Sequence, residues 1–105
     1  MFMIKVPLPK TLKKYGITKD EWLEMYNSQG GRCAICKNDL EDKRVNTDHY
    51  HRKGWKSLPD ELRKQDIRGL LCWTCNHLIV GRGVTLERLH NAVVYLESFE
   101  RRKRK

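Results

Sequence analysis

Two Cys-x-x-Cys pairs constrain this chain more than any other feature of its sequence. Cys33 and Cys36 form the first pair, and Cys72 and Cys75 form the second. Two intervening residues let both sulfurs of a pair reach one ion, and four thiolates make a tetrahedral zinc site with zinc–sulfur distances of about 2.3 Å. Because four thiolates leave no open position, we expect this zinc to be structural. Its binding would contribute on the order of 10 kcal/mol, comparable with the whole stability of a small domain.

The size and composition of the chain explain why it needs such a site. With 105 residues, of which 39% are hydrophobic and 33% charged, it is one domain near the lower limit for a self-supporting core. The opening segment, residues 1–10, has no long apolar run and no cleavage site, so we expect neither a signal peptide nor a membrane span. We therefore expect a cytoplasmic protein, in which paired cysteines favour metal. Disulfides or free core cysteines are the alternative.

The net charge of +9 is concentrated at the two ends of the chain. Residues 1–16 contain four lysines and no acid, residues 101–105 are all basic, and residues 17–100 are neutral overall. Basic ends suit a polyanion such as DNA, because each neutralised phosphate releases counterions. We therefore divide the chain into a loosely held basic arm (1–16), a zinc-containing domain (17–100) and a basic tail (101–105). A purely solubilising role is the alternative for the tail.

The hydrophobic pattern predicts an α+β domain with flanking helices. Thr18 and Glu21 form a capping box, which starts a helix whose Trp22, Leu23 and Tyr26 face the core.

Two short strands, residues 45–49 and 68–72, are predicted to pair with each other, and a short helix over 58–65 lies between them in sequence. Another helix starts near Thr74, and Thr85 caps the last one.

An apolar stripe on this last helix has two interpretations. Its residues are Leu86, Leu89, Val93 and Leu96. We expect the stripe to face the core, with a dimer seam as the alternative. Whether the protein is a monomer or a homodimer stays open.

The side chains needed to hydrolyse a phosphodiester occur together around the predicted strands. His49 can accept a proton from water near neutral pH, and the Asp48 and Asn76 side chains offer hard oxygen ligands for Mg²⁺ or Mn²⁺. Asn76 follows Cys75, so the zinc site would fix its position. On a regular strand Asp48 and His49 point to opposite faces, so the strand must end or bulge there if both serve one site. In the alternative, Asp48 is a turn residue and His49 and His51 are solvated.

Three motifs together resemble the phage recombination endonuclease VII family. They are Gln-Gly-Gly-Arg-Cys-Ala-Ile-Cys (29–36), Asp-His-x-His (48–51) and Arg-Gly-Leu-Leu-Cys-x-x-Cys-Asn (68–76), with Tyr-Gly-Ile-Thr (15–18) ahead of them. The resemblance covers roughly residues 15–80. It implies a small zinc-stapled ββα-metal domain (HNH, His-Me finger) and a phage-encoded DNA endonuclease that acts in a bacterial host.

The resemblance also implies a role for each residue of the site. The two cysteine pairs hold zinc, Asp48 and Asn76 bind a catalytic Mg²⁺ or Mn²⁺, and His49 is the general base. His51 matches a second family histidine, which we expect to contact phosphate or to support the site.

Two departures from the family pattern affect the choice of substrate. The segment between His51 and Arg68 is longer than the short turn expected for the family, and it is rich in basic residues. The junction-resolving enzyme of the family, by resemblance, uses a longer C-terminal part in an intertwined dimer, so nicking, duplex cleavage and branched-DNA cleavage all stay open. The residues that we expect to contact DNA are Arg52, Lys53, Lys56, Arg63, Lys64, Arg101, Arg102, Lys103, Arg104 and Lys105.

The tryptophans and the overall function each leave alternatives. Trp73 is expected to pack in the core or to shield the zinc rather than to stack on bases, whereas both roles stay open for Trp55. The leading hypothesis is a metal-dependent DNA endonuclease. The alternatives are a non-catalytic zinc module that binds nucleic acid or a partner protein, and a regulatory subunit of a larger phage packaging or repair machine. The set Asp48, His49 and Asn76 separates them, because a pure binder does not need it.

Overall fold

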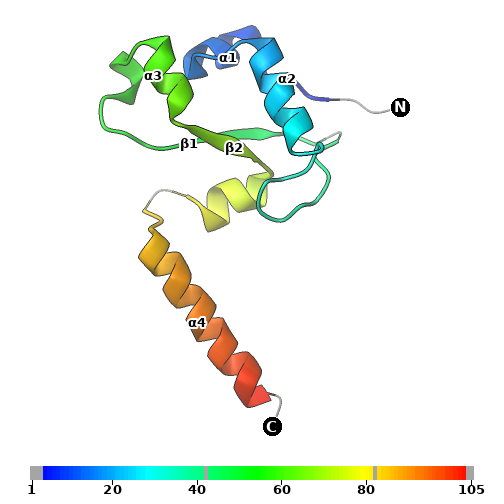
Figure 1. The fold of residues 1–105 in the computed structure, drawn as a ribbon, viewed down its shortest axis with the longest axis vertical. Helices are drawn as coiled ribbons and strands as arrows, with labels where there is room; N and C mark the ends of the chain where they lie inside the picture. Colours follow the sequence, from blue (N-terminus) through cyan, green and yellow to red (C-terminus); the bar gives the residue numbers. More distant parts are fainter. Residues whose placement is uncertain (1–3, 42, 82, 104–105) are drawn as a thin grey trace.

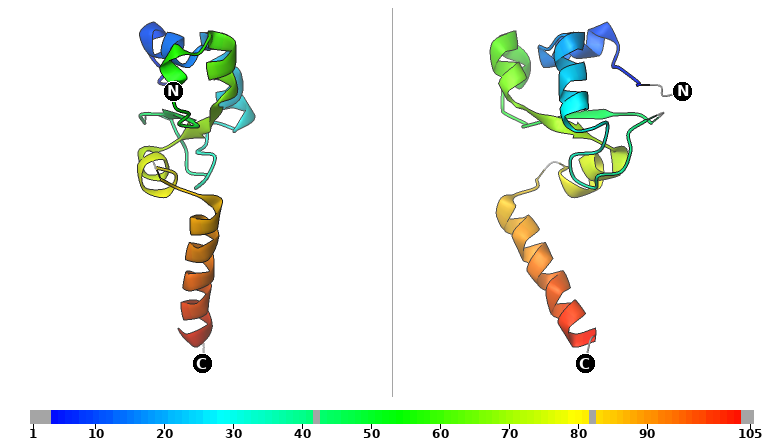
Figure 2. Two further views of the ribbon diagram at one scale, coloured as in Figure 1. Left: turned by 90° about the vertical axis from the view of Figure 1, so that its left-hand side faces the viewer. Right: turned by 45° about the vertical axis from the view of Figure 1, so that its right-hand side comes forward.

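A computed structural model of the chain describes residues 4–41, 43–81 and 83–103. A two-stranded hairpin lies at the centre, helices α1 to α3 gather on one side of it, and α4 points away from the other end (Figures 1 and 2). Along the chain the elements are α1 (Pro9–Tyr15), α2 (Lys19–Ser28), β1 (Asn46–His49), η1 (Trp55–Ser57), α3 (Asp60–Gln65), β2 (Ile67–Leu71), η2 (Cys75–Ile79) and α4 (Leu86–Lys103).

The antiparallel hairpin of β1 and β2 confirms the predicted strand pair, and it contains an irregularity. Asp48 lies opposite Gly69, but the next residue, His49, lies opposite Ile67. Arg68 is therefore an extra residue on β2 with no partner on β1, which defines a β-bulge. The bulge falls between Asp48 and His49, and β1 ends at His49. For Asp48 and His49 to serve one site, we expected the strand to end or to bulge there, and the structure has both features.

Helix α2 begins as predicted and anchors on the hairpin through an aromatic pair. Thr18 and Glu21 make the reciprocal hydrogen bonds of a capping box. Trp22 is completely buried, stacks on Tyr26 at 5.6 Å between ring centroids, and donates its indole N–H to the Thr47 hydroxyl of β1 at 3.2 Å. This buried hydrogen bond satisfies the polar edge of the indole, so the ring can lie inside the core.

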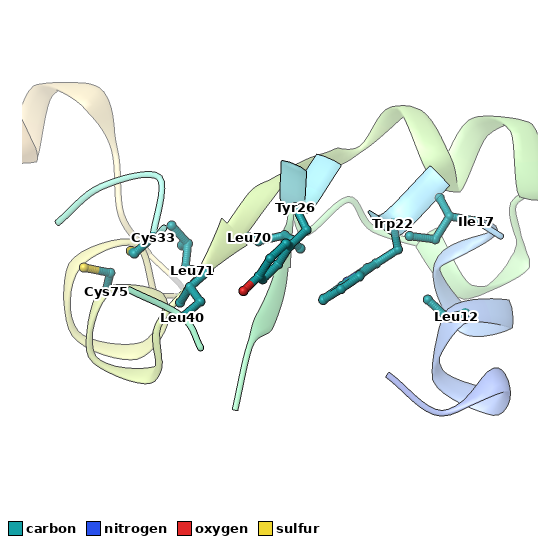
Figure 3. Packing of buried hydrophobic residues seen from close by; sticks show 9 residues of the cluster. All are labelled: Leu12, Ile17, Trp22, Tyr26, Cys33, Leu40, Leu70, Leu71 and Cys75. Atoms are coloured by element: carbon teal, nitrogen blue, oxygen red, sulfur yellow. The ribbon is translucent and has the colours of Figure 1, made fainter. Parts of the chain in front are cut away.

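The hydrophobic core is one row of side chains that includes two of the cysteines. Figure 3 shows it running from the cysteine cluster, past the hairpin, to α1. In that order its members are Cys75, Cys33, Leu71, Leu40, Leu70, Tyr26, Trp22, Ile17 and Leu12. The cysteine site and the hydrophobic core are therefore one structure.

The interpretation of residues 1–16 as a loosely held arm is wrong for the part that forms α1. Pro9 occupies the first turn of this helix, where its missing N–H removes no hydrogen bond, and Leu12 is buried in the core. Gly16 ends the helix with φ +73°, and a Cβ there would lie 2.6 Å from the carbonyl oxygen of Asp60. The proline thus starts a helix that the rest of the fold holds in place. Residues 1–3 lie outside the described residues.

The segment between the strands contains the predicted short helix, α3, and docks on α1 and α2. The Arg63 guanidinium donates to the Lys14 carbonyl at 3.1 Å and pairs with Asp60. Lys64 pairs with Glu21 of α2 at 2.7 Å. The insertion is therefore part of the folded body.

Helix α4 is capped as predicted, but its apolar stripe does not face the core. Thr85 accepts a hydrogen bond from a backbone N–H of the first turn. Leu86 is 88% exposed, Val93 and Leu96 are exposed as well, and Leu89 is only half-buried. The pattern indicated an apolar face correctly, but the described chain leaves most of that face uncovered. None of the described helices is both long enough and apolar enough to cross a membrane.

Candidate functional site

The four cysteines converge, as the sequence predicted. Their Sγ atoms all lie within 4.8 Å of one another, and those of Cys36 and Cys72 are 3.8 Å apart. A tetrahedral site with zinc–sulfur distances of about 2.3 Å places its sulfurs about 3.8 Å from one another. The donor set and its spacing therefore fit one structural metal ion, and zinc in particular.

The first cysteine pair lies in a tight turn that is tied to β2. Lys37 adopts a left-handed conformation, with φ 66°, and its ammonium group donates to the Ala34 carbonyl at 2.8 Å. The Ala34 N–H in turn donates to the Leu70 carbonyl at 3.1 Å. The turn is thereby held against the strand that leads directly to the second pair.

The thiols have strongly unequal acidities. Burial acts to raise the pKa of Cys33, but hydrogen bonds from backbone N–H groups, first that of Cys72, lower it to about 6. Burial and the neighbouring sulfurs, first that of Cys72, raise the pKa of Cys75 to about 12. A buried thiolate at Cys75 therefore needs a cation beside it, as a metal-ligating thiol does.

Asp48 lies on β1 as a buried carboxylate with a single ionic partner. Arg68, the bulged residue of β2, donates from Nε to Oδ2 at 2.7 Å and from Nη2 to Oδ1 at 3.0 Å. The side chain of Asp48 is 7% exposed and that of Arg68 is 41% exposed. Both oxygens of the expected metal ligand are thus engaged by a guanidinium that solvent can reach.

His49, the last residue of β1, has its ring held between aromatic side chains. Trp55 of the insertion stacks on it at 4.4 Å between centroids with the planes 23° apart, and Tyr15 of α1 meets its edge at 5.3 Å. The ring centroid of His51 lies 4.6 Å from that of His49. Burial, followed by the charge of His51, lowers the pKa of His49, while the charge of Asp48 opposes the shift. The ring is therefore oriented, and it is biased toward the neutral form that can accept a proton.

His49 opens onto a strongly cationic cavity of about 840 Å³. Its basic lining residues are Lys14, His49, His51, Arg52, Lys53, Lys56 and Arg68, and Tyr50 lines it as well. Asp48 instead lines a smaller groove of about 340 Å³, between β2 and the start of α4. Arg68 lines both hollows and so connects the carboxylate to the cationic cavity.

Asn76 is placed beside the cysteine site but apart from these two hollows. It is half-buried on η2, directly after Cys75, and its backbone N–H donates to the Cys72 carbonyl at 3.0 Å. Asn76 is not among the described residues that line either hollow.

The basic residues of the insertion divide into two groups. Lys53 and Lys56 line the cationic cavity, and so does Arg52, although it also pairs with the buried Asp66 at 2.7 Å. Arg63 and Lys64 instead make the internal ion pairs that dock α3, and the Arg63 side chain is only 17% exposed.

The basic residues of the tail lie at the far end of α4. Arg101, Arg102 and Lys103 are exposed on its last turn, and Arg104 and Lys105 lie outside the described residues.

The structure places Trp55 inside the fold and Trp73 at its surface. Trp73 is 54% exposed and stacks on His77 at 4.7 Å, so the expectation of core packing is wrong. Trp55, for which both roles were open, is buried against His49.

Sequence reasoning did not assign a role to three residues of this site. Arg68 belongs to a quoted motif but was treated as part of a strand, and its position opposite Asp48 depends on the bulge. Tyr15 and Lys14 belong to α1, which was interpreted as an arm. The sequence signal that could have identified Arg68 is an Asp-His pair on one predicted strand with an arginine on the strand predicted to pair with it.

Comparison with known proteins agrees with the motifs. The recombination endonuclease VII family matches residues 9–98. The Gene 59 protein of Mycobacterium phage D29 is 38% identical over 89 residues, which are 83% of this chain and 47% of that protein. The Gene 59 protein of Mycobacterium phage L5 is 40% identical over 73 residues, which are 69% of this chain and 38% of that protein.

The chain spans less than half the length of either curated relative. No solved structure gives a significant match. Because the family match extends from α1 nearly to the end of α4, the chain belongs to the recombination endonuclease VII family.

Proposed function

We propose that this chain is a metal-dependent endonuclease that hydrolyses phosphodiester bonds of DNA within a ββα-metal (HNH) domain. The family supports nuclease chemistry. The observation that carries the proposal is the placement of His49. His49 lies at the end of β1 between aromatic rings, and its lowered pKa favours the neutral imidazole. It faces a cationic cavity that is large enough for part of a DNA strand.

In this proposal, four side chains divide the work of hydrolysis. His49 accepts the proton of the attacking water, and His51 contacts the phosphate. Asp48 and Asn76, with hard oxygen donors, would hold Mg²⁺ or Mn²⁺, which when bound supplies positive charge for the developing charge on the phosphate and the leaving oxygen. The four cysteines fix β2 and η2, which carry or flank these residues.

DNA would be bound by the cations of the cavity and of α4. Lys14, Arg52, Lys53 and Lys56 line the cavity, and Arg101, Arg102 and Lys103 extend the basic surface. Since Arg63 and Lys64 are engaged in internal ion pairs, we leave them out of the proposed interface. The phage origin of the relatives supports action on DNA inside an infected bacterial cell.

The first experiment replaces the proposed base. His49→Ala should lower plasmid nicking in Mg²⁺ or Mn²⁺ by on the order of a hundredfold or more, because removal of a general base costs about that much. DNA affinity and zinc content should persist. His90→Ala, which removes an exposed histidine of α4, is the matched control. Full activity of His49→Ala would contradict the assignment.

A non-catalytic zinc module that binds nucleic acid is the second candidate. Two observations favour it: both oxygens of Asp48 are paired with Arg68, and Asn76 lines neither hollow. If the wild-type chain binds DNA but cuts neither supercoiled plasmid nor branched DNA in any divalent metal, the binding module is correct.

A further inference from the structure

The ion pair of Asp48 and Arg68 is unusual in where it lies. Arg68 is the extra residue of the β-bulge, so no residue of β1 fixes its position across the sheet. Its guanidinium nevertheless engages both oxygens of a buried carboxylate, at 2.7 and 3.0 Å. The bulge therefore aims an arginine at the one residue of β1 that the proposed function assigns to a divalent ion.

The arginine and a divalent ion compete for the same carboxylate. Mg²⁺ requires an oxygen ligand at about 2.1 Å in a near-octahedral arrangement. A guanidinium that covers both Asp48 oxygens leaves the outer lone pairs less accessible, and its positive charge repels a second cation a few ångströms away. An ion can occupy Asp48 fully only if the guanidinium moves.

The surroundings of Arg68 provide a place for it to move to. Its side chain is 41% exposed and lines both the groove that contains Asp48 and the cationic cavity that contains His49. A phosphate in that cavity offers a guanidinium the same two-pronged acceptor as the carboxylate. The move exchanges one bidentate partner for another.

We propose that Arg68 is an exchangeable cation: it neutralises Asp48 in the free protein and transfers to a DNA phosphate when a divalent ion takes its place. This inference rests on the proposed function. It follows that the ion and DNA strengthen each other's binding, because each favours the arrangement that the other needs, and such coupling is reciprocal. Arg68 then contributes to the reaction by holding the phosphate beside His49.

The alternative is that Arg68 permanently orients Asp48 as a metal ligand. The two roles predict opposite changes in the affinity for the divalent ion when Arg68 is removed. Removing a permanent support weakens binding of the divalent ion, whereas removing a competitor strengthens it.

The test measures Mn²⁺ binding to the zinc-loaded full chain by electron paramagnetic resonance. Without DNA, Arg68→Gln should bind Mn²⁺ on the order of tenfold more tightly than wild type, because a repelling charge is gone. Arg68→Lys retains that charge and should stay near wild type, and Arg44→Gln removes an exposed arginine as the matched control. Asp48→Asn should abolish the binding, which assigns it to this site.

A second arm adds duplex DNA in the His49→Ala background, which prevents cutting. DNA should raise the Mn²⁺ affinity of the chain with Arg68 but not that of Arg68→Gln. If Arg68→Gln binds Mn²⁺ equally or more weakly without DNA, Arg68 is a fixed support and the proposal is overturned.

A measurement with Arg68 in place, again in the His49→Ala chain, covers the case in which Arg68→Gln does not fold. The Arg68 Nε–H resonance of this ¹⁵N-labelled protein should shift when Mg²⁺ and DNA are added together. A resonance that stays unchanged at saturation overturns the exchange. Unchanged Mn²⁺ affinities in a chain that cuts DNA count against the exchange alone, while a chain that shows the exchange but never cuts counts against the nuclease alone.

Discussion

At the scale of single residues, the side-chain amide of Gln29 replaces a neighbouring strand beside β2. Its Nε2 donates to the carbonyls of Leu70 and Arg32 at 3.0 and 2.8 Å, and its Oε1 accepts from the Leu70 N–H at 2.9 Å. A Cβ on Gly69 would lie 3.1 Å from that Oε1. The space for the Gln29 amide thus depends on the absence of a Cβ at Gly69. Together the two residues join the end of α2 to β2, the strand that bears Arg68.

A double-mutant cycle tests this pairing. Gln29→Ala leaves the partly buried Leu70 N–H without its acceptor, while the Leu70 carbonyl keeps the Ala34 N–H, and should cost about 1–3 kcal/mol of unfolding free energy. Gly69→Ala should destabilise the wild type, because it displaces the amide, but should cost much less once Gln29 is alanine. Urea unfolding of the four proteins measures the coupling. Additive losses of stability would mean that the two residues act independently.

The clamp around His49 makes a prediction about pH. Burial lowers the pKa of His49 below its ordinary value of 6.5, so the ring stays neutral, and able to accept a proton, to lower pH than a solvated histidine. The acid limb of the cleavage rate should therefore lie below 6.5, and a divalent ion at Asp48 would move it in the same direction. Trp55→Ala opens the site and should shift this limb upward.

Trp73→Ala, which removes an exposed tryptophan, is the matched control for that pH profile and should leave the limb in place. An acid limb that Trp55→Ala does not move would separate the clamp from the acidity of His49.

At the scale of elements, α1 and α4 show what a sequence pattern can and cannot determine. The capping box of α2 was predictable because it involves neighbours in the chain. The apolar stripe of α4 was equally clear, but periodicity identifies an apolar face and not its partner. Helix α1 carries a single buried side chain, Leu12, among lysines, so its pattern was too weak to distinguish it from an arm.

The exposure of α4 predicts that the body folds without most of it. Deleting residues 91–105 removes no buried side chain of the described chain, so the melting temperature should change little. DNA affinity should fall, and the salt dependence of binding should decrease by roughly one unit for each phosphate that the shortened chain no longer neutralises. Leu12→Ala is the contrasting variant, since truncation of a buried leucine costs about 2–5 kcal/mol. A strongly reduced melting temperature after the deletion would show that α4 is packed in solution.

The cysteine cluster was predictable from the sequence, whereas the arrangement of side chains around Asp48 and His49 was not. Cys-x-x-Cys spacing and the Asp-His-x-His motif indicated the chemistry, because local sequence carries both. The pairing of Asp48 with Arg68 depends on a bulge, and the stacking of Trp55 on His49 depends on the return of a long segment, so neither could follow from alternation along a strand.

At the scale of the whole molecule, the cysteine site closes one end of the row of buried hydrophobic side chains (Figure 3). Removing zinc should therefore disorder the hairpin and η2 together, since on the order of 10 kcal/mol exceeds what a core this small can replace. Cys36→Ser should unfold the chain at ordinary temperature, as followed by circular dichroism. Ile35→Ser, an exposed neighbour in the same turn, is the control and should remain folded. Cys36→Ser with wild-type melting would contradict a structural zinc.

The pairing of His49 with Ile67 has a consequence for how the proposed nuclease could diversify. Residues 50–66 leave the hairpin after His49 and return to it at Ile67, the residue that pairs with His49. The Tyr50 N–H donates to the Asp66 carbonyl and joins the two ends of this segment. Because residues 50–66 contribute no member of the buried core cluster, a segment of another length can replace them if its contacts with α1 and α2 are rebuilt. Residues 50–66 carry Trp55 as well as the cavity residues Lys53 and Lys56. A replacement segment that changed DNA binding would therefore also change the pKa of His49. In this molecule, choice of substrate and working pH would be inherited together.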